Sequence, residues 1–117
     1  MELKPIKPTI KFDTLEQIDV RVGQIEAVHE IEKSDKLVKL IVDFGDHTRS
    51  IVVGMKQERS DLQAILGQQA LFVVNLEPRK MMGETSEGML FDIGYADGVT
   101  PVLATPENPV PNGTRAG

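Results

Sequence analysis

A predicted β-hairpin between residues 36 and 53 constrains the fold more than any other feature. Apolar and polar residues alternate from Lys36 to Phe44, which places four side chains on one face: Val38, Leu40, Val42 and Phe44. Gly45-Asp46 is a turn signal, and Arg49 to Val53 reads as the returning strand. Side chains of a strand alternate between its two faces, so this pattern predicts a hairpin with one buried face.

Other apolar runs supply the remaining strands. Val20 to Ile31 is rich in β-branched residues, and its apolar parity changes at Gly23-Gln24, which predicts a bulge that bends the strand. Gln69 to Leu76 is nearly continuously apolar and is predicted to be a central strand. Met89 to Ile93 is the last clear strand, and Val99 to Ala104 is a candidate edge strand.

Two short helices complete the order of elements. Asp13-Thr14-Leu15-Glu16 fits a capping box with Asp13 as N-cap, and Ser60 to Leu66 predicts a helix ended by Gly67. Five strands with a helix between the third and fourth predict one all-β domain, a Greek-key barrel of the OB-fold type. An SH3-like barrel is the competitor, but it would not normally place a helix at residues 61–66.

Composition excludes several classes of function. The chain of 117 residues has no cysteine, and its two histidines lack the spacing of a ligand pair, so neither a metal nor another cofactor is expected. No apolar stretch approaches the ~20 residues of a membrane span, and the N-terminus lacks the apolar run of a signal peptide. The expected compartment is the cytoplasm.

Catalysis is not favoured. The carboxylates are scattered without acid/base spacing, and Ser86-Glu87-Gly88 lacks the first glycine of a nucleophile elbow. Gly83 and Gly88 are too far apart for a phosphate-binding glycine loop.

The segment from Asn75 to Met89 favours binding instead. It lies between two apolar runs and is predicted to be a loop that presents Arg79, Lys80, an amide and a hydroxyl. Further cations fall on or near the predicted hairpin: Lys33, Lys36, Lys39 and Arg49. In an OB-fold these two regions converge on one side of the barrel, where cations would pair with phosphates.

Local charge agrees with this reading although the net charge is −5. Residues 33–80 contain eight Lys/Arg and six Asp/Glu, whereas the rest has five basic and twelve acidic residues. The aromatic residues are four Phe and one Tyr, and Phe44, Phe72 and Phe91 stand in apolar strand contexts. A single-strand binder with exposed stacking platforms is therefore disfavoured, and recognition of folded RNA by shape and backbone fits better.

Each selected residue also has a structural interpretation. Arg79 and Lys80 would simply be solvated, and Met81 and Met82 would fill the barrel end. Three others would serve the framework or the surface: Asn75 as a backbone cap, Ser86 as a turn former, and Met89 as half core and half surface.

Six segments stand out in order along the chain: Asp19-Val20-Arg21-Val22-Gly23, Ser34-Asp35-Lys36-Leu37, Val42-Asp43-Phe44-Gly45, Ile51-Val52-Val53-Gly54, Asn75-Leu76-Glu77-Pro78-Arg79-Lys80-Met81 and Ser86-Glu87-Gly88-Met89. Together they resemble a known family, the tRNA-binding OB-fold domain at the C-terminus of bacterial methionyl-tRNA synthetases and in small free-standing proteins. The resemblance covers the chain from about residue 12 onward.

The resemblance implies a non-enzymatic homodimer that binds the outer corner of tRNA, alone or attached to an aminoacyl-tRNA synthetase. By motif match, Lys36 would face phosphate; Asn75, Arg79 and Lys80 would border the groove; Ser86 and Met89 would touch exposed nucleotides. Dimerisation would fall to the N-terminal arm, residues 1–12, and to the C-terminal extension, residues 99–117.

The alternative is a CsaA-type export-related chaperone that binds unfolded preproteins. Met55-Lys56-Gln57 is similar to the corresponding segment of that sister branch, whereas the motifs Pro-Arg-Lys-Met and Ser-Glu-Gly-Met favour tRNA binding. A third reading is a fragment of a longer synthetase, although the chain has no room for an aminoacylation domain.

Overall fold

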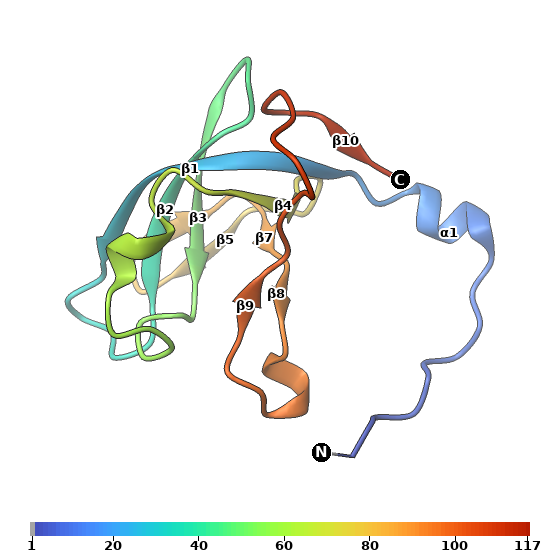
Figure 1. Ribbon diagram of the computed structural model, residues 1–117, viewed down its shortest axis with the longest axis horizontal. Coiled ribbons are helices and arrows are strands. Elements are labelled where there is room, and N and C mark those ends of the chain that lie inside the picture. Colours follow the sequence, from blue (N-terminus) through green and yellow to red (C-terminus); the bar gives the residue numbers. More distant parts are fainter. Residues whose placement is uncertain (1) are drawn as a thin grey trace.

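The computed structural model describes residues 2–117 and shows an all-β chain built around one curled antiparallel sheet (Figure 1). Its strands are β1 (Val20–Glu30), β2 (Val38–Asp43), β3 (Thr48–Val53), β4 (Gln69–Val73), β5 (Arg79–Met81), β6 (Glu84–Ser86), β7 (Met89–Leu90), β8 (Asp92–Ile93), β9 (Val102–Leu103) and β10 (Arg115–Ala116). The short helices of the described part are α1 (Phe12–Glu16), η1 (Leu62–Ile65) and η2 (Tyr95–Asp97).

The main sheet has the order β3-β2-β1-β4-β7, and β10 pairs with the first residues of β1. Two two-stranded sheets are separate from it: the hairpin β5–β6, which lies against β3, and the pair β8–β9. The strand order, with η1 between β3 and β4, confirms the predicted OB-fold architecture.

Strand β1 bends because it serves two partners. Its residues 20–24 pair with β4 and its residues 24–30 pair with β2. The β2 register shifts between Ile25 and Ala27, so the extra residue is Glu26. The bulge predicted at Gly23-Gln24 is therefore misplaced. Val22 and Ile25 are both buried, and the strand is regular between them, so they lie on opposite faces and their parity change needs no bulge.

The core lies inside the curl of the sheet. The alternation predicted for β2 is confirmed, since Val38, Leu40 and Val42 are fully buried between half-buried neighbours. The remaining members come from every wall of the barrel: Ile25, Val28, Phe44, Ile51, Met55, Ile65, Ala70, Phe72, Val74 and Leu90.

Two helix predictions have different outcomes. The helix before Gly67 is present as the 3₁₀ turn η1, with the Asp61 carboxylate accepting from the Gln63 N–H at 3.0 Å. Helix α1 begins at Phe12, with Lys11 at the N-cap position and no side-chain cap, so Asp13 is not the N-cap. Because α1 buries no residue, tertiary packing does not fix where it starts.

The C-terminal third differs from its predicted strands. Residues 89–93 divide into β7, which pairs with β4, and β8, which pairs with β9. The candidate edge strand at 99–104 is reduced to β9, and β10 was not predicted. Figure 1 shows the N-terminal arm and α1 extending away from the barrel.

Candidate nucleic-acid interface

The outward face of β2 and β3 forms the centre of the candidate interface. In the β2–β3 register Lys39 stands opposite Val52, and Leu40 opposite Ile51. Leu40 and Ile51 are fully buried, so Lys39 lies on the outer face. An OB-fold commonly binds its ligand on this face.

Residues 79–86 form a β-hairpin beside that face, and the prediction of a loop is wrong there. Arg79 pairs with Ser86, Lys80 with Thr85 and Met81 with Glu84. The two linking residues, Met82 and Gly83, have φ of 51° and 82°. Positive φ at both positions is the geometry of a type I′ turn, the connection that suits two-residue hairpins.

The hairpin separates its two adjacent cations. Neighbouring residues of a strand point to opposite faces, so Lys80 and Thr85 share one face and Arg79 shares the other with Ser86. Both cationic side chains are exposed, and neither has a hydrogen-bond or ion-pair partner among residues 2–117. They are therefore available to an anionic ligand.

Ser86, Glu87 and Gly88 close the barrel against β3. The Ser86 hydroxyl accepts from the Val52 N–H at 3.0 Å and donates to the Gly88 carbonyl at 3.0 Å. The Glu87 carboxylate accepts from the Ser50 N–H at 3.0 Å. A β-carbon at Gly88 would lie 2.7 Å from the Val73 carbonyl oxygen, so only glycine fits without a shift.

Ser86 therefore lies within this closure and not on the surface. Its side chain is buried, and both hydrogen-bonding directions of its hydroxyl are used within the chain. The geometry supports the turn-forming interpretation over direct contact with nucleotides. Met89 lies next to this closure, with 44% of its surface exposed, as expected for a residue shared between core and surface.

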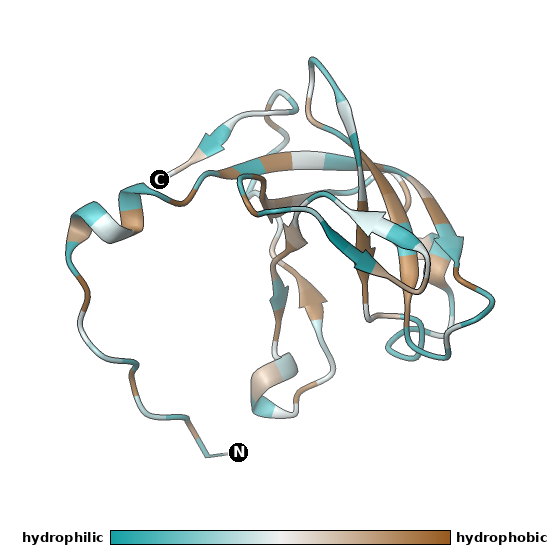
Figure 2. Cartoon of the chain, turned by 180° about the vertical axis from the view of Figure 1, so that it is seen from behind, coloured by the Kyte–Doolittle hydropathy of each residue, from teal (hydrophilic) through white to brown (hydrophobic). Residues whose placement is uncertain are grey.

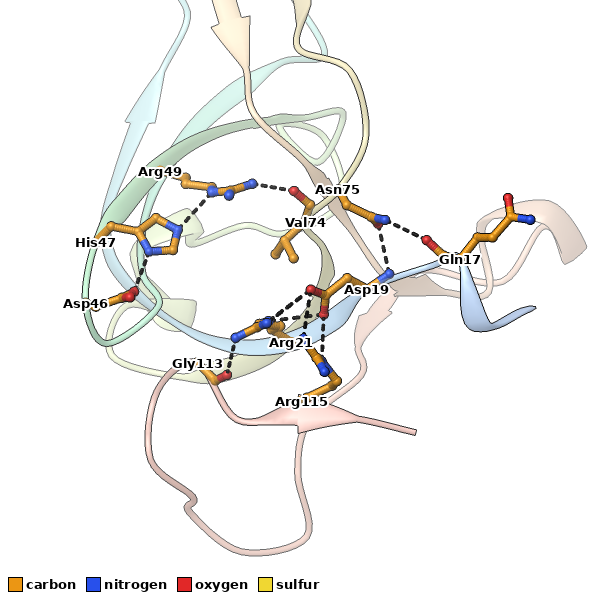
Figure 3. Close-up of polar contacts among 10 residues, drawn as sticks. All are labelled: Gln17, Asp19, Arg21, Asp46, His47, Arg49, Val74, Asn75, Gly113 and Arg115. Atoms are coloured by element: carbon orange, nitrogen blue, oxygen red, sulfur yellow. Dashed lines mark hydrogen bonds and ion pairs between the residues drawn. The ribbon is translucent and has the colours of Figure 1, made fainter. Parts of the chain in front are cut away.

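Asn75 connects the barrel to the arm (Figure 3). Its amide oxygen accepts from the Asp19 N–H at 2.8 Å, and its amide nitrogen donates to the Gln17 carbonyl at 2.6 Å. Both polar groups of the amide thus hold the chain between α1 and β1. Asn75 lies at the entrance to the hairpin segment, but this geometry is that of a backbone cap.

The loop between β1 and β2 carries the exposed side chain of Lys36. The Ser34 hydroxyl accepts from the Lys36 and Leu37 N–H groups at 3.2 and 3.1 Å. The Lys56 ammonium donates to the Ile31 and Ser34 carbonyls at 3.0 and 2.8 Å, so it braces this loop from the opposite side. Sequence reasoning assigned Lys56 no such role, because its partners lie more than twenty residues away.

Arg49 does not belong to the outward face, contrary to its grouping with the hairpin cations. It stands opposite Val42 in the register, on the inward parity. Its guanidinium donates to the carbonyls of Val74 and Glu87 and to His47 Nε2 (Figure 3). Arg49 therefore closes one end of the barrel and is occupied by internal acceptors.

A second group of charges ties the C-terminal strand to β1. Asp19 forms ion pairs with Arg21 at 3.1 Å and Arg115 at 3.3 Å (Figure 3). The Arg21 hydrogen bond lowers the pKa of Asp19, and Arg115 lowers it further. Asp19 thus helps to hold β10 beside β1.

Two other kinds of feature are absent from the described residues. Within residues 2–117 no cluster of three or more His, Asp or Glu side chains is arranged to hold a metal ion. No helix in that range is long and apolar enough to cross a membrane. Two surface cavities, of about 610 and 600 Å³, are lined by residues outside the β5–β6 hairpin.

Known proteins share this arrangement. Residues 20–115 match the family described as "Putative tRNA binding domain". A methionine–tRNA ligase of Chloroherpeton thalassium is 40% identical over 101 residues, which are 86% of this chain and 14% of the ligase. The chain thus spans about one seventh of that relative's length.

Solved structures agree with the sequence match. A MetRS-related protein from Pyrococcus horikoshii has a TM-score of 0.86 and 33% identity, with 95% of this chain and all of that chain covered. The chaperone CsaA of Bacillus anthracis has a TM-score of 0.81 and 25% identity, with coverages of 94% and 100%. The match over 96 consecutive residues shows that this chain belongs to the tRNA-binding domain family.

Proposed function

We propose that this chain binds tRNA without catalysing a reaction, by recognising the shape and backbone of the folded RNA. The observation that carries the proposal is the hairpin β5–β6, which presents exposed Arg79 and Lys80 beside the outward face of β2 and β3. Lys36 adds a third exposed cation from the neighbouring loop. Family membership supports tRNA as the polyanion.

The mechanism is electrostatic attraction followed by fit to a rigid surface. Cations that neutralise phosphates release counterions, which supplies affinity without reading base sequence. The closure by Ser86 and Glu87 fixes the hairpin on β3 before RNA arrives, so little ordering remains to be done on binding. In this proposal Ser86 and Asn75 position the interface, whereas Lys36, Arg79, Lys80 and Met89 face the RNA.

We also propose that two copies form a homodimer through apolar surface outside the barrel. Figure 2 shows apolar segments along the arm and on the β8–β9 hairpin. Leu3, Ile6 and Phe12 are 80%, 99% and 70% exposed, and Tyr95 and Val102 are 76% and 56% exposed. Exposed apolar surface of this kind marks interaction sites. Two linked RNA-binding faces would raise the effective concentration of one at a tRNA held by the other.

Only part of the C-terminal extension is available for this proposed interface. The Gln69 amide exchanges hydrogen bonds with the backbone of Val110, at 2.6 and 3.2 Å. The Thr114 carbonyl accepts from the Val22 N–H at 2.9 Å. Residues 110–116 are thus bound to their own barrel, whereas the exposed side chain of Val102 on β9 is available to a second copy.

In the cell we place this activity in the cytoplasm, as a free-standing protein or as an accessory domain of a methionyl-tRNA synthetase. A CsaA-like chaperone is the competing function, favoured by the same exposed apolar residues and by the structural likeness.

A competition experiment separates the two functions. Fluorescent tRNA is bound to the protein and challenged with unlabelled tRNA, duplex RNA, single-stranded DNA or an unfolded polypeptide. We expect unlabelled tRNA to displace the probe most effectively and the polypeptide to leave it bound. Strong binding of the polypeptide with weak binding of tRNA would favour the chaperone. The molecular mass in solution, measured alongside, tests the dimer.

A further inference from the structure

Of the four cations proposed for the interface, Lys36, Lys39, Arg79 and Lys80, Lys39 is the one that has an ion-pair partner among the described residues. Its ammonium lies 3.4 Å from Oε2 of Glu84, which comes from β6, 45 residues later. The ion pair spans from β2 to the β5–β6 hairpin. It therefore connects the two surfaces that the proposed function assigns to RNA.

The pair is weak enough to exchange. A charge-assisted N–H···O hydrogen bond is typically ~2.7–2.9 Å long, and this contact is longer. The Lys39 and Glu84 side chains are 28% and 39% exposed, so water screens their attraction. A phosphate group, which is also an anionic acceptor, is chemically able to replace the carboxylate at the Lys39 ammonium.

Glu84 is not needed to anchor the hairpin. Backbone pairing of β5 with β6, the Ser86 hydroxyl on Val52 and the Glu87 carboxylate on Ser50 hold it in place. Within residues 79–86 Glu84 is the sole acidic residue, beside Arg79 and Lys80. Its carboxylate thus lowers the positive charge of the interface without supplying an essential contact.

We propose that Glu84 is a specificity-determining residue that favours tRNA over a flexible single strand, because its carboxylate occupies the Lys39 ammonium until a phosphate replaces it. The inference rests on the proposed binding of tRNA. An RNA that contacts both the hairpin and the outward face of β2 reaches Lys39. One of its phosphates then replaces the Glu84 carboxylate as the partner of the Lys39 ammonium. A flexible single strand that contacts the hairpin alone leaves the Lys39–Glu84 ion pair intact, and the carboxylate of Glu84 repels its phosphates.

The test compares wild type with Glu84→Gln, Lys39→Ala and the double variant, against tRNA and against an oligouridine, each titrated at several salt concentrations. Glu77→Gln is the matched control, because Glu77 is exposed, precedes the hairpin and forms no ion pair within residues 2–117. Thermal unfolding of each variant verifies that the fold is retained.

The expected result differs between the two ligands. For tRNA, Glu84→Gln raises affinity by about fivefold or less and leaves the salt slope nearly unchanged, since Lys39 already contacts phosphate. For oligouridine it steepens the slope by about 0.7, the value for one further phosphate contact on a single strand. Adding Lys39→Ala removes that gain, and Glu77→Gln does not produce it. The preference for tRNA over oligouridine therefore falls.

Other outcomes overturn the inference. Equal effects of Glu84→Gln and Glu77→Gln would show that only total charge matters. Weaker tRNA binding by Glu84→Gln, with or without a lower melting temperature, would make Glu84 a structural support. If wild type binds tRNA but Lys39→Ala leaves its salt slope unchanged, Lys39 does not contact phosphate and the exchange is refuted. Failure of wild type to bind tRNA would instead refute the proposed function itself.

Discussion

Replacing Ser86 by alanine should destabilise the protein and leave the exposed cations of the RNA-contacting surface unchanged. The substitution removes the acceptor of the Val52 N–H and the donor to the Gly88 carbonyl, at a side chain that is only 5% exposed. A buried donor left without a partner costs about 1–3 kcal/mol. For 117 residues, an unfolding entropy of ~2.1 cal/mol/K per residue makes each kcal/mol worth about 4 °C. The melting temperature should therefore fall by about 4–12 °C.

Urea unfolding followed by circular dichroism measures the loss of unfolding free energy directly. The midpoint should decrease while the dependence of the unfolding free energy on urea stays constant, because a local defect does not alter the surface exposed on unfolding. Thr85→Ala is the control, since Thr85 is exposed on the opposite face of the hairpin. A loss of stability no greater than that of Thr85→Ala would refute the role of Ser86 in closing the barrel.

Two further predictions concern the framework. Gly88→Ala should cost about 1–3 kcal/mol, because its β-carbon would lie 2.7 Å from the Val73 carbonyl oxygen, whereas Gly54→Ala should be tolerated, since no atom lies within 4 Å there; urea unfolding of both variants is the check. Burial, and then the nearby Asp92 carboxyl, raise the pKa of Glu58 to about 6 from an ordinary value of 4.5. The folded state therefore binds this proton more tightly than the unfolded chain, and its stabilising contribution is lost as the pH rises from 4.5 through about 6. The melting temperature of wild type should therefore fall over this pH interval, and that of Glu58→Gln should fall less. Identical pH profiles of the two proteins would contradict the raised pKa of Glu58.

The alternation of β2 could be predicted from the sequence because one buried face imposes a period of two. Val38, Leu40 and Val42 satisfy that rule without exception. The same rule predicts the inward position of Arg49, which shares its parity with Ile51. Its charge suggested the surface instead, and only the tertiary structure reveals the carbonyls of Val74 and Glu87 that make an inward guanidinium acceptable.

The β5–β6 hairpin was missed for a local reason. A two-residue turn of this type favours asparagine or aspartate before glycine, whereas here Met82 adopts the left-handed conformation, which is rare for such a side chain. Ser86 and Asn75 were assigned to the RNA-binding site, with their framework roles as the alternative interpretation, for a different reason. Their partners, Val52, Asp19 and Gln17, lie 34 to 58 positions away in the sequence, so no local pattern indicates them.

The most direct test of the account is the salt dependence of tRNA binding by Arg79→Ala/Lys80→Ala. Losing two phosphate contacts should flatten the plot of log affinity against log salt by about 1.4–1.8. The advantage of wild type over this variant should then shrink about tenfold when salt is raised fourfold. Lys4→Ala/Lys7→Ala, which removes the same charge from the exposed arm, should leave the slope unchanged. Equal slopes for wild type and Arg79→Ala/Lys80→Ala would contradict the hairpin as the RNA-binding element.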